Sequence, residues 1–314
     1  MAACSLAKGS RRQYQGHFNI LVQAAEAGGF DPLAMSTDDV HFSCLFFVLS
    51  RSVYSLDSFL SGVEHHLSSN QTSLPAGGKV KLRPFKRALM RLFGSADTPI
   101  KAFALSKSVV HAMVAHLNPL VPEQAMIGAW LLIAFLFALR PEDVTAGKVR
   151  WSDFTFREDG SFDLVIRAGK SATRIGDTIF SMPSPPPNAV VDPNRWVAAL
   201  WVHAFPSGRP ASKLQLSQRR PFTDFETGKF LSSRKLAGYL KRLYSAATGK
   251  PAPVGLTAYS LRRGGATEHL EAKMDPVHLR HLMRHASFNT TAEYIDSVST
   301  RNSRMEFTKS LLLP

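Results

Sequence analysis

Cysteine and acidic residues are scarce in this sequence. Only two of its 314 residues are cysteine, Cys4 and Cys44, which excludes a disulfide framework and a cysteine-rich zinc site. Such low cysteine use is typical of a reduced, intracellular protein. The 24 acidic residues are outnumbered by 38 lysines and arginines, which leaves a formal net charge of +14. A charge of this size predicts a polyanion or an anionic membrane as the partner.

Other sequence features are also absent, and each absence excludes a class of protein. The longest apolar run, 126–139, has 14 residues and is too short to cross a bilayer, so we expect no membrane association. The sequence contains no glycine-rich phosphate-binding loop, no Gly-x-Ser-x-Gly and no dinucleotide fingerprint. We therefore expect no cofactor, and a reaction that breaks bonds would have to conserve their energy in a covalent intermediate.

Acids are missing from the first 25 residues as well. Residues 1–12 combine Ser and Ala with Lys8, Arg11 and Arg12, a composition shared by organelle transit peptides and by flexible basic arms. Because this segment has no clear amphipathic face, we interpret it as a basic N-terminal arm.

The composition and the length of the chain indicate a globular protein of two domains. The chain is 45% hydrophobic and only 20% charged, which excludes disorder by composition, and its length exceeds the usual size of one domain. Residues 13–93 are predicted to be mainly helical. The stretch 94–101, which contains Gly, Ser and Pro, is the best linker candidate. We place a helical domain at 13–97 and a second domain at 98–314.

The second domain is predicted to combine helices with a small sheet. A helix that starts at Pro122 and is apolar nearly all round through Leu139 should be buried in a core. Residues 154–156, 162–166 and 178–182 are typical of three short strands in a meander, after which helices resume. The predicted fold class is therefore mainly α with a small antiparallel β-sheet (α+β).

A basic helix is predicted over 79–93, at the end of the first domain. No acid occurs between Glu64 and Asp97, so its cations lack the usual i, i+4 partners. Such a run is compatible with a solvated face, a nuclear-localisation-like run or a helix that contacts DNA phosphates, and we assign it to DNA binding. Its basic residues are Lys79, Lys81, Arg83, Lys86, Arg87 and Arg91.

Three short patterns in the second domain carry candidate catalytic residues. An arginine is followed three positions on by an acid (Arg140 and Asp143), an arginine closes the tetrapeptide 259–262, and a histidine stands nine positions before a tyrosine (His285 and Tyr294). The ordered set resembles the tyrosine recombinase/integrase family of site-specific DNA recombinases. In that family the patterns are an Arg with an acid, a His-x-x-Arg, and a His or Trp before the nucleophilic Tyr.

The resemblance implies a catalytic domain at 98–314 and a core-binding, DNA-clamping domain at 13–97. It also implies a 3′-phosphotyrosyl intermediate and a general-acid lysine in a β-hairpin, for which Lys170 is the best match and Arg174 a distant second. The chemistry of the residue types agrees, because guanidinium groups stabilise charge on phosphate oxygens and general-acid help is worth ~10²- to 10⁴-fold. The implied catalytic residues are Arg140, Lys170, Tyr259, Arg262, His285 and Tyr294, with Asp143 in support.

Two positions depart from the family's pattern. Tyr259 stands where a His commonly precedes the second Arg. A phenol can donate a hydrogen bond to phosphate, but with an ordinary pKa of about 10 it is a poor proton acceptor at neutral pH. We therefore expect Tyr259 to position the phosphate and His285 to take part in proton transfer. Arg284 replaces a common Gly, and we assign it to DNA contact together with Arg263.

A zinc site is an alternative interpretation of the same region. His278, His281 and His285 have a spacing that would place them on one helix face. The neighbouring arginines would repel a dication, and only Asp275 offers a carboxylate, so we expect no metal.

We expect a recombinase that acts on duplex DNA as a tetramer on two DNA sites. The sequence of residues 261–267, Leu-Arg-Arg-Gly-Gly-Ala-Thr, resembles eukaryotic mobile-element recombinases more than bacterial chromosome-dimer resolvases. A eukaryotic host would place the protein in the nucleus. A type IB topoisomerase and a catalytically inactive DNA-binding descendant are the alternatives. The apolar tail 311–313 is compatible with packing on its own domain or with docking into a neighbouring protomer.

Overall fold

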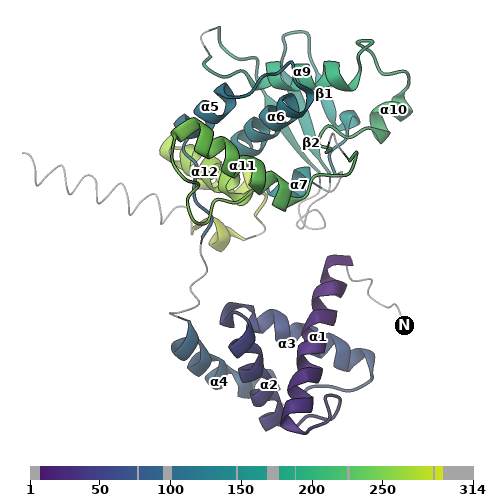
Figure 1. Ribbon diagram of the computed structural model, residues 1–314, viewed down its shortest axis with the longest axis vertical. Coiled ribbons are helices and arrows are strands. Elements are labelled where there is room, and N and C mark those ends of the chain that lie inside the picture. Colours follow the sequence, from purple (N-terminus) through teal and green to yellow (C-terminus); the bar gives the residue numbers. More distant parts are fainter. Residues whose placement is uncertain are drawn as a thin grey trace, which may run out of the picture. The chain divides into compact units, whose positions relative to one another are not determined.

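The computed structural model describes residues 8–75, 78–94, 101–145, 148–167, 177–187, 189–224, 227–285 and 287–292. The chain divides into two compact units, 1–100 and 101–314 (Figure 1). This division falls three residues beyond the boundary that the sequence predicts.

The described part of unit 1 is helical. It contains α1 (Lys8–Gly28), α2 (Thr37–Ser50), α3 (Leu56–Ser69) and α4 (Gly78–Phe93), with a 3₁₀ turn η1 (Val53–Ser55) before α3. Because α1 begins at Lys8, residues 8–12 are helical, and the predicted arm is wrong for this part. Phe47 of α2 stacks on Phe59 of α3 with ring centroids 4.4 Å apart, and Leu21 of α1 is buried in the same core. The amphipathic helices thus enclose a core of their own.

The described part of unit 2 is mixed. Its helices are α5 (Lys107–Ala115), α6 (Pro122–Leu136), α7 (Pro141–Val144), α9 (Pro193–Ala204), α10 (Lys213–Gln218), α11 (Ser233–Thr248), α12 (Tyr259–Glu271) and α13 (Pro276–Leu282). A 3₁₀ turn, η2 (Trp151–Asp153), leads into β1 (Phe154–Phe156), β2 (Phe162–Ile166) and β3 (Thr178–Met182). The predicted fold class, mainly α with a small antiparallel sheet, is confirmed.

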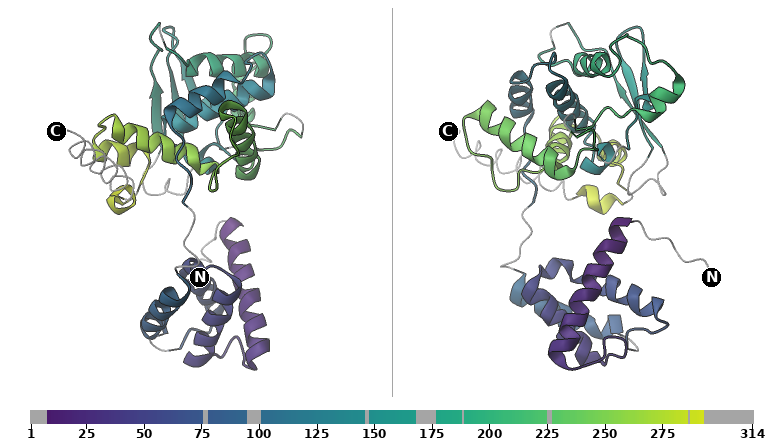
Figure 2. Two further views of the ribbon diagram at one scale, coloured as in Figure 1. Left: turned by 60° about the vertical axis from the view of Figure 1, so that its left-hand side comes forward. Right: turned by 45° about the vertical axis from the view of Figure 1, so that its right-hand side comes forward.

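Helix α6 forms the centre of unit 2, and residues 125–135 are all buried. It packs against α9, α12 and α5. The strands form one antiparallel sheet in the order β1-β2-β3, with Leu164 opposite Phe180, and the sheet lies at one side of the unit (Figure 2). None of the described helices has the length and apolarity needed to cross a membrane.

Two glycines place α12 directly against its neighbours. A Cβ on Gly264 would lie 2.1 Å from the carbonyl oxygen of Leu105, and one on Gly265 would lie 2.0 Å from that of Phe135 in α6. Only glycine permits such a backbone approach. The close packing fixes the first turn of α12, which carries Tyr259 and Arg262, relative to the end of α6.

Candidate active site

The chain turns sharply between α6 and α7, and this turn presents Arg140. Helix α6 ends at Leu136, three residues before the predicted end, and Ala138 adopts a left-handed φ of 45°. Pro141 then opens α7 with Arg140 as its N-cap, and Asp143 Oδ2 accepts a hydrogen bond from the Arg140 backbone N–H (3.0 Å). Asp143 therefore orients the backbone of Arg140, as an N3 carboxylate does in a capping box.

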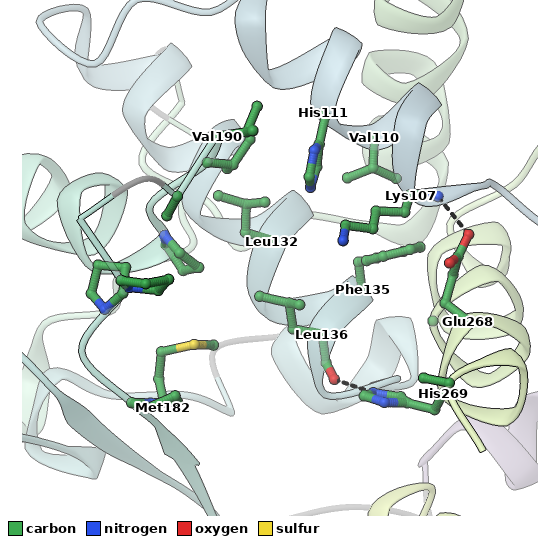
Figure 3. Close-up of a pocket in the computed structure, with 18 of the residues that line it drawn as sticks. Lys107, Val110, His111, Leu132, Phe135, Leu136, Met182, Val190, Glu268 and His269 are labelled. Carbon is green, nitrogen blue, oxygen red and sulfur yellow. Dashed lines mark hydrogen bonds between the residues drawn. The ribbon is translucent and has the colours of Figure 1, made fainter. Parts of the chain in front are cut away.

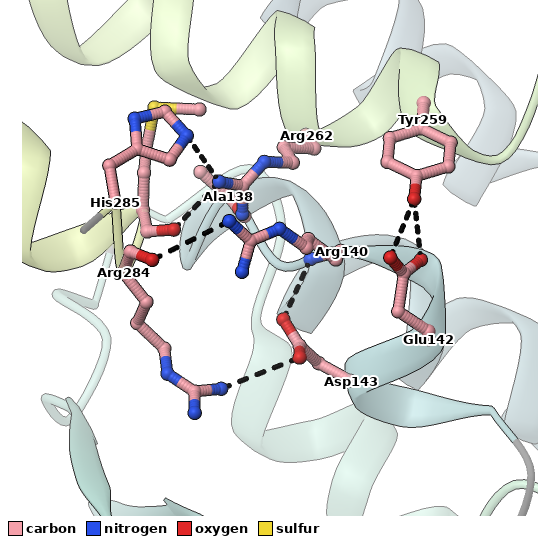
Figure 4. Close-up of polar contacts among 9 residues, drawn as sticks. Ala138, Arg140, Glu142, Asp143, Tyr259, Arg262, Arg284 and His285 are labelled. Atoms are coloured by element: carbon pink, nitrogen blue, oxygen red, sulfur yellow. Dashed lines mark hydrogen bonds and ion pairs between the residues drawn. The ribbon is translucent and has the colours of Figure 1, made fainter. Parts of the chain in front are cut away.

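Arg262 lies in the first turn of α12 and is 4% exposed. Its Nη1 donates to the carbonyl oxygen of Ala138 (2.7 Å), and its Nη2 donates to that of Met283 (2.6 Å) and lies 2.8 Å from His285 Nε2 (Figure 4). The Arg140 Nη2 reaches the carbonyl oxygen of Arg284 (3.5 Å) in the same turn. Both guanidinium groups are thus held in place by hydrogen bonds to backbone carbonyls.

His285 is buried beside these two arginines. Burial, followed by the charges of Arg262 and Arg140, lowers the pKa of His285 to about 4, so its imidazole is neutral at pH 7. Nε2 then accepts from Arg262, and Nδ1 carries the proton that bonds Thr291 Oγ1 (2.9 Å). The sequence predicts a proton-transfer role for His285. In the structure both ring nitrogens have hydrogen-bond partners, and the imidazole helps to hold Arg262 in place.

Arg284 is not the surface contact that the sequence predicts. Its side chain is 1% exposed, and its Nη1 lies 3.4 Å from Oδ1 of the equally buried Asp143. Burial raises the pKa of Asp143, and the charge of Arg284 is the largest influence that opposes this rise. Among the described residues, Nε and Nη2 of Arg284 have no hydrogen-bond partner. The assignment of Arg284 to direct DNA contact is wrong, because the guanidinium is buried to neutralise Asp143.

Tyr259 begins α12 and is 43% exposed. Its hydroxyl lies 2.7 Å from both carboxylate oxygens of Glu142, the second residue of α7 (Figure 4). Burial, and then this hydrogen bond, raises the pKa of the Tyr259 phenol above its ordinary value. The sequence did not single out Glu142, since no local pattern links two residues that are 117 positions apart.

Known proteins match this chain in fold but not in sequence. No protein-family model matches the chain, and no curated protein matches it in sequence. Solved structures match it closely in fold. The lambda integrase (75–356) dimer bound to a COC′ core site has a TM-score of 0.60 at 14% identity, covering 93% of this chain and 90% of that one. The protein has the tyrosine-recombinase fold.

Two further structures show the same fold. XerH site-specific recombinase bound to palindromic difH substrate, a post-cleavage complex, has a TM-score of 0.58 at 14% identity, covering 87% of this chain and 72% of that one. The Tn1549 transposon integrase (aa 82–397) in complex with circular intermediate DNA has a TM-score of 0.60 at 15% identity, covering 93% and 91%. At these identities the match concerns the fold, and the residues must be judged from their own geometry.

Within this tyrosine-recombinase fold, some predicted site residues lie outside the described residues. These are Lys170 and Tyr294, and the same holds for the side chains of Lys79 and Lys81 and for the tail 311–313. The structure therefore brings together Arg140, Arg262 and His285, with Tyr259 and Asp143 beside them.

The remaining predicted DNA contacts differ in their environments. Arg83 and Arg87 are exposed on α4, as is Arg91, and their spacing of four residues places them on one helix face. Lys86 instead forms an ion pair with Asp57 of α3, a tertiary partner that the local sequence does not reveal. Arg263 is half-buried, and its Nη1 donates to the carbonyl oxygen of Ala102 (3.0 Å) ahead of α5. We infer a structural contribution for Lys86 and Arg263.

The predicted exclusion of zinc concerns three histidines, of which His278 and His281 are exposed and His285 is buried. Helix α13 ends at Leu282, so His285 does not share its face. Within the described ranges, no group of three or more His, Cys, Asp or Glu side chains could hold a metal ion.

Unit 2 also contains a cavity of about 500 Å³ (Figure 3). Its walls are mostly apolar side chains of α5, α6 and the segment after β3, and its polar rim includes Lys107, Glu268 and His269. At this rim Glu268 accepts from the Lys107 backbone N–H (2.8 Å), and His269 Nε2 lies 2.7 Å from the carbonyl oxygen of Leu136. None of the predicted site residues lines this cavity, and its contacts help to hold α12 against α5 and α6.

Proposed function

We propose that this protein is a site-specific DNA recombinase that cleaves and rejoins DNA strands through a 3′-phosphotyrosyl intermediate, in the integration or excision of a mobile element. The observation that carries the proposal is the convergence of Arg140 and Arg262 beside a neutral His285. Two guanidinium groups from distant parts of the sequence, both anchored by backbone carbonyls, form a preorganised site for one phosphate. The recombinases of the same fold support this interpretation.

The reaction needs a nucleophile and an acid in addition to this anion site. Tyr294 would attack the scissile phosphorus, forming the Oη–P bond while the bond to the 5′-oxygen breaks. Arg140 and Arg262 would stabilise the charge on the non-bridging oxygens, with Asp143 fixing the Arg140 turn. Lys170 would protonate the leaving 5′-oxygen, and the reverse steps would rejoin the strand.

Duplex DNA is the proposed partner. The net charge of +14 and the exposed face of Arg83, Arg87 and Arg91 support binding through the phosphate backbone. We propose that unit 1 is the core-binding domain and unit 2 the catalytic domain. We also propose a tetramer on two DNA sites, and a nuclear location if the host is eukaryotic.

The test uses a pool of duplexes of randomised sequence, each with one nick. Cleavage a few nucleotides from the nick releases a short fragment, so the covalent complex is trapped and survives a denaturing gel. We expect an adduct with the wild-type protein and with Tyr54→Phe, which alters an exposed phenol of unit 1, but none with Tyr294→Phe. An adduct that persists in Tyr294→Phe would contradict the proposed nucleophile.

Sequencing the trapped DNA distinguishes the alternatives. Enrichment of one motif supports a site-specific recombinase. Adducts without sequence preference, together with relaxation of supercoiled plasmid, would identify a type IB topoisomerase. DNA binding without any adduct would identify a catalytically inactive descendant.

A further inference from the structure

Helix α2 of unit 1 carries apolar residues on two faces. One face, which includes Phe47 and Val48, is buried where α2 packs against α1, α3 and α4 (Figure 1). A helix that is apolar nearly all round is normally buried all round. The second face is exposed instead: Phe42 is 40% exposed, Leu45 is 37% exposed and Leu49 is 70% exposed. Packing within unit 1 therefore does not account for these three side chains.

Phe42, Leu45 and Leu49 form one apolar stripe along α2, which we call the α2 stripe. Their spacing of three and four residues places them on one side of the helix over two turns, as in the a and d positions of a coiled coil. Phe30, which follows α1, meets Phe42 edge to face with ring centroids 6.3 Å apart and widens the patch. A contiguous exposed apolar patch with a polar rim is typical of an interaction surface.

The two ends of the α2 stripe carry opposite charges. Asp38 lies one helical turn before Phe42, and its side chain is 100% exposed. Arg51 is the C-cap of α2 and is also exposed. An acid is favoured at a helix N-terminus, which explains Asp38 taken alone. Together, the acid, the apolar stripe and the arginine form a surface that is complementary to its own reversed copy.

We propose that the α2 stripe is an interface between two copies of this chain, which pair with their α2 helices antiparallel about a two-fold axis near Leu45. Residues at similar distances on the two sides of Leu45 then face one another. Phe42 packs against the partner's Leu49, and Asp38 meets the partner's Arg51. A parallel pair would instead bring like charges together at both ends.

The chemistry of the α2 stripe favours a second copy over the other large partners of a basic protein. Residues 37–50 contain no lysine or arginine, so this face offers no cation to DNA phosphates. The acids in the first turn of α2 would be repelled by an anionic membrane. A second copy supplies both an apolar surface and the opposite charges. The pairing needs no DNA, so it is independent of the proposed cleavage reaction and of the tetramer on two DNA sites.

The test is sedimentation equilibrium of the full chain without DNA, at about 0.15 M salt so that the net charge of +14 is screened. One helix face is smaller than a standard interface, so we expect a weak dimer whose fraction rises with protein concentration. Leu49→Glu places a carboxylate in the apolar contact of both copies and should raise the dimer Kd at least about tenfold. Leu120→Glu is the matched control, because Leu120 is 80% exposed in unit 2, and it should leave the Kd unchanged.

A pair of charge reversals tests the antiparallel arrangement. Asp38→Arg makes both ends of the stripe positive and Arg51→Asp makes both ends negative, so each variant alone should dimerise about tenfold more weakly. Mixed in equal amounts, the two variants should form a heterodimer with an affinity close to that of the wild type, since each positive end then meets a negative one. Recovery on mixing would also show that neither variant has lost its fold.

A wild-type chain that stays monomeric at every concentration would overturn the inference. A dimer that Leu49→Glu weakens no more than Leu120→Glu would also overturn it, because the contact would then lie elsewhere. If the two charge variants form no heterodimer in preference to their homodimers, the antiparallel pairing of α2 is wrong.

Discussion

At the scale of single residues, Arg284 combines an unfavourable backbone conformation with a favourable ion pair to Asp143. Its φ of 54° is left-handed, where a side chain other than glycine costs about 1 kcal/mol. Its guanidinium, however, neutralises a carboxylate that is 1% exposed, and removing one member of a buried ion pair costs about 3–5 kcal/mol. The second effect is larger, which explains why an arginine occupies a position where glycine would relieve strain.

Arg284→Gly should therefore destabilise unit 2 by about 2–4 kcal/mol. All four tryptophans lie in unit 2, so urea unfolding followed by tryptophan fluorescence reports this unit. Lys273→Gly is the control, because Lys273 has a φ of 61° and is exposed. Relief of strain alone should stabilise that variant slightly. If Arg284→Gly were as stable as the wild type, the ion pair with Asp143 would contribute little.

Arg284 also shows which contacts of the site cannot be predicted from the sequence. Arg140, Arg262 and His285 could be predicted because their order and spacing are visible along the chain, and the structure brings them together. The prediction that Arg284 contacts DNA rests on the rule that a charged residue in a basic chain is usually exposed, and Arg284 is buried. Its partner Asp143 is 141 positions away, and Glu142 meets Tyr259 over a similar separation. Such tertiary pairs have no local signature.

At the scale of secondary structure, the elements were easier to predict than their ends. The strands 154–156, 162–166 and 178–182 have the predicted bounds, because turn residues separate short apolar segments. Helix α6 was expected to run through Leu139 and ends at Leu136, since the left-handed Ala138 and Pro141 redirect the chain. Hydrophobicity alone does not show this turn, although the turn is what presents Arg140.

Helix α12 depends on its glycines for position. Gly265→Ala would place a methyl group 2.0 Å from the Phe135 carbonyl oxygen, so the helix must shift. We expect a loss of about 1–3 kcal/mol in urea unfolding, together with reduced cleavage, since Arg262 shares this helix. Gly238→Ala in α11 meets nothing within 4 Å and should stabilise by about 0.5–1 kcal/mol. Equal effects in the two variants would refute the role of close packing.

Helix α4 provides a test of the proposed DNA contacts. Replacing Arg83, Arg87 and Arg91 together by alanine should lower the slope of log K against log salt by about 2–3, because each phosphate contact contributes about 0.9. Lys86→Ala is the matched control. Lys86 is paired with Asp57, so its loss should change the slope much less than any single arginine. The measurement is a salt titration of duplex binding, and an equal change from Lys86→Ala would contradict the assignment of the exposed face.

At the scale of the whole molecule, the two units have separate cores. Among the described residues, one core cluster lies within 21–89 and the larger one within 105–261. The sequence predicted this division from the composition of the linker, and the core clusters give the physical reason for it. Each unit should therefore respond to acid through its own buried histidines.

His17 of unit 1 is 8% exposed between Phe47 and Phe59, and burial lowers its pKa. In unit 2 the pKa of His285 is lowered to about 4. A histidine with a lowered folded pKa takes up its proton at a lower pH in the native state than in the unfolded chain, where protonation begins below about pH 6.5. The stability of each unit should then fall as the pH drops from 6.5, by up to about 1.4 kcal/mol per pH unit for each such histidine.

The prediction is tested by thermal unfolding between pH 7.5 and 5, with tryptophan fluorescence reporting unit 2 and far-UV circular dichroism reporting both units. His17→Gln cannot titrate, so it should make only the unit 1 transition less sensitive to pH. His66 has a lowered pKa as well, so some sensitivity should remain. His285→Asn should act only on the unit 2 transition. If either variant changed the pH dependence of both transitions equally, the two units would unfold as one, and separate cores would not define the stability of this molecule.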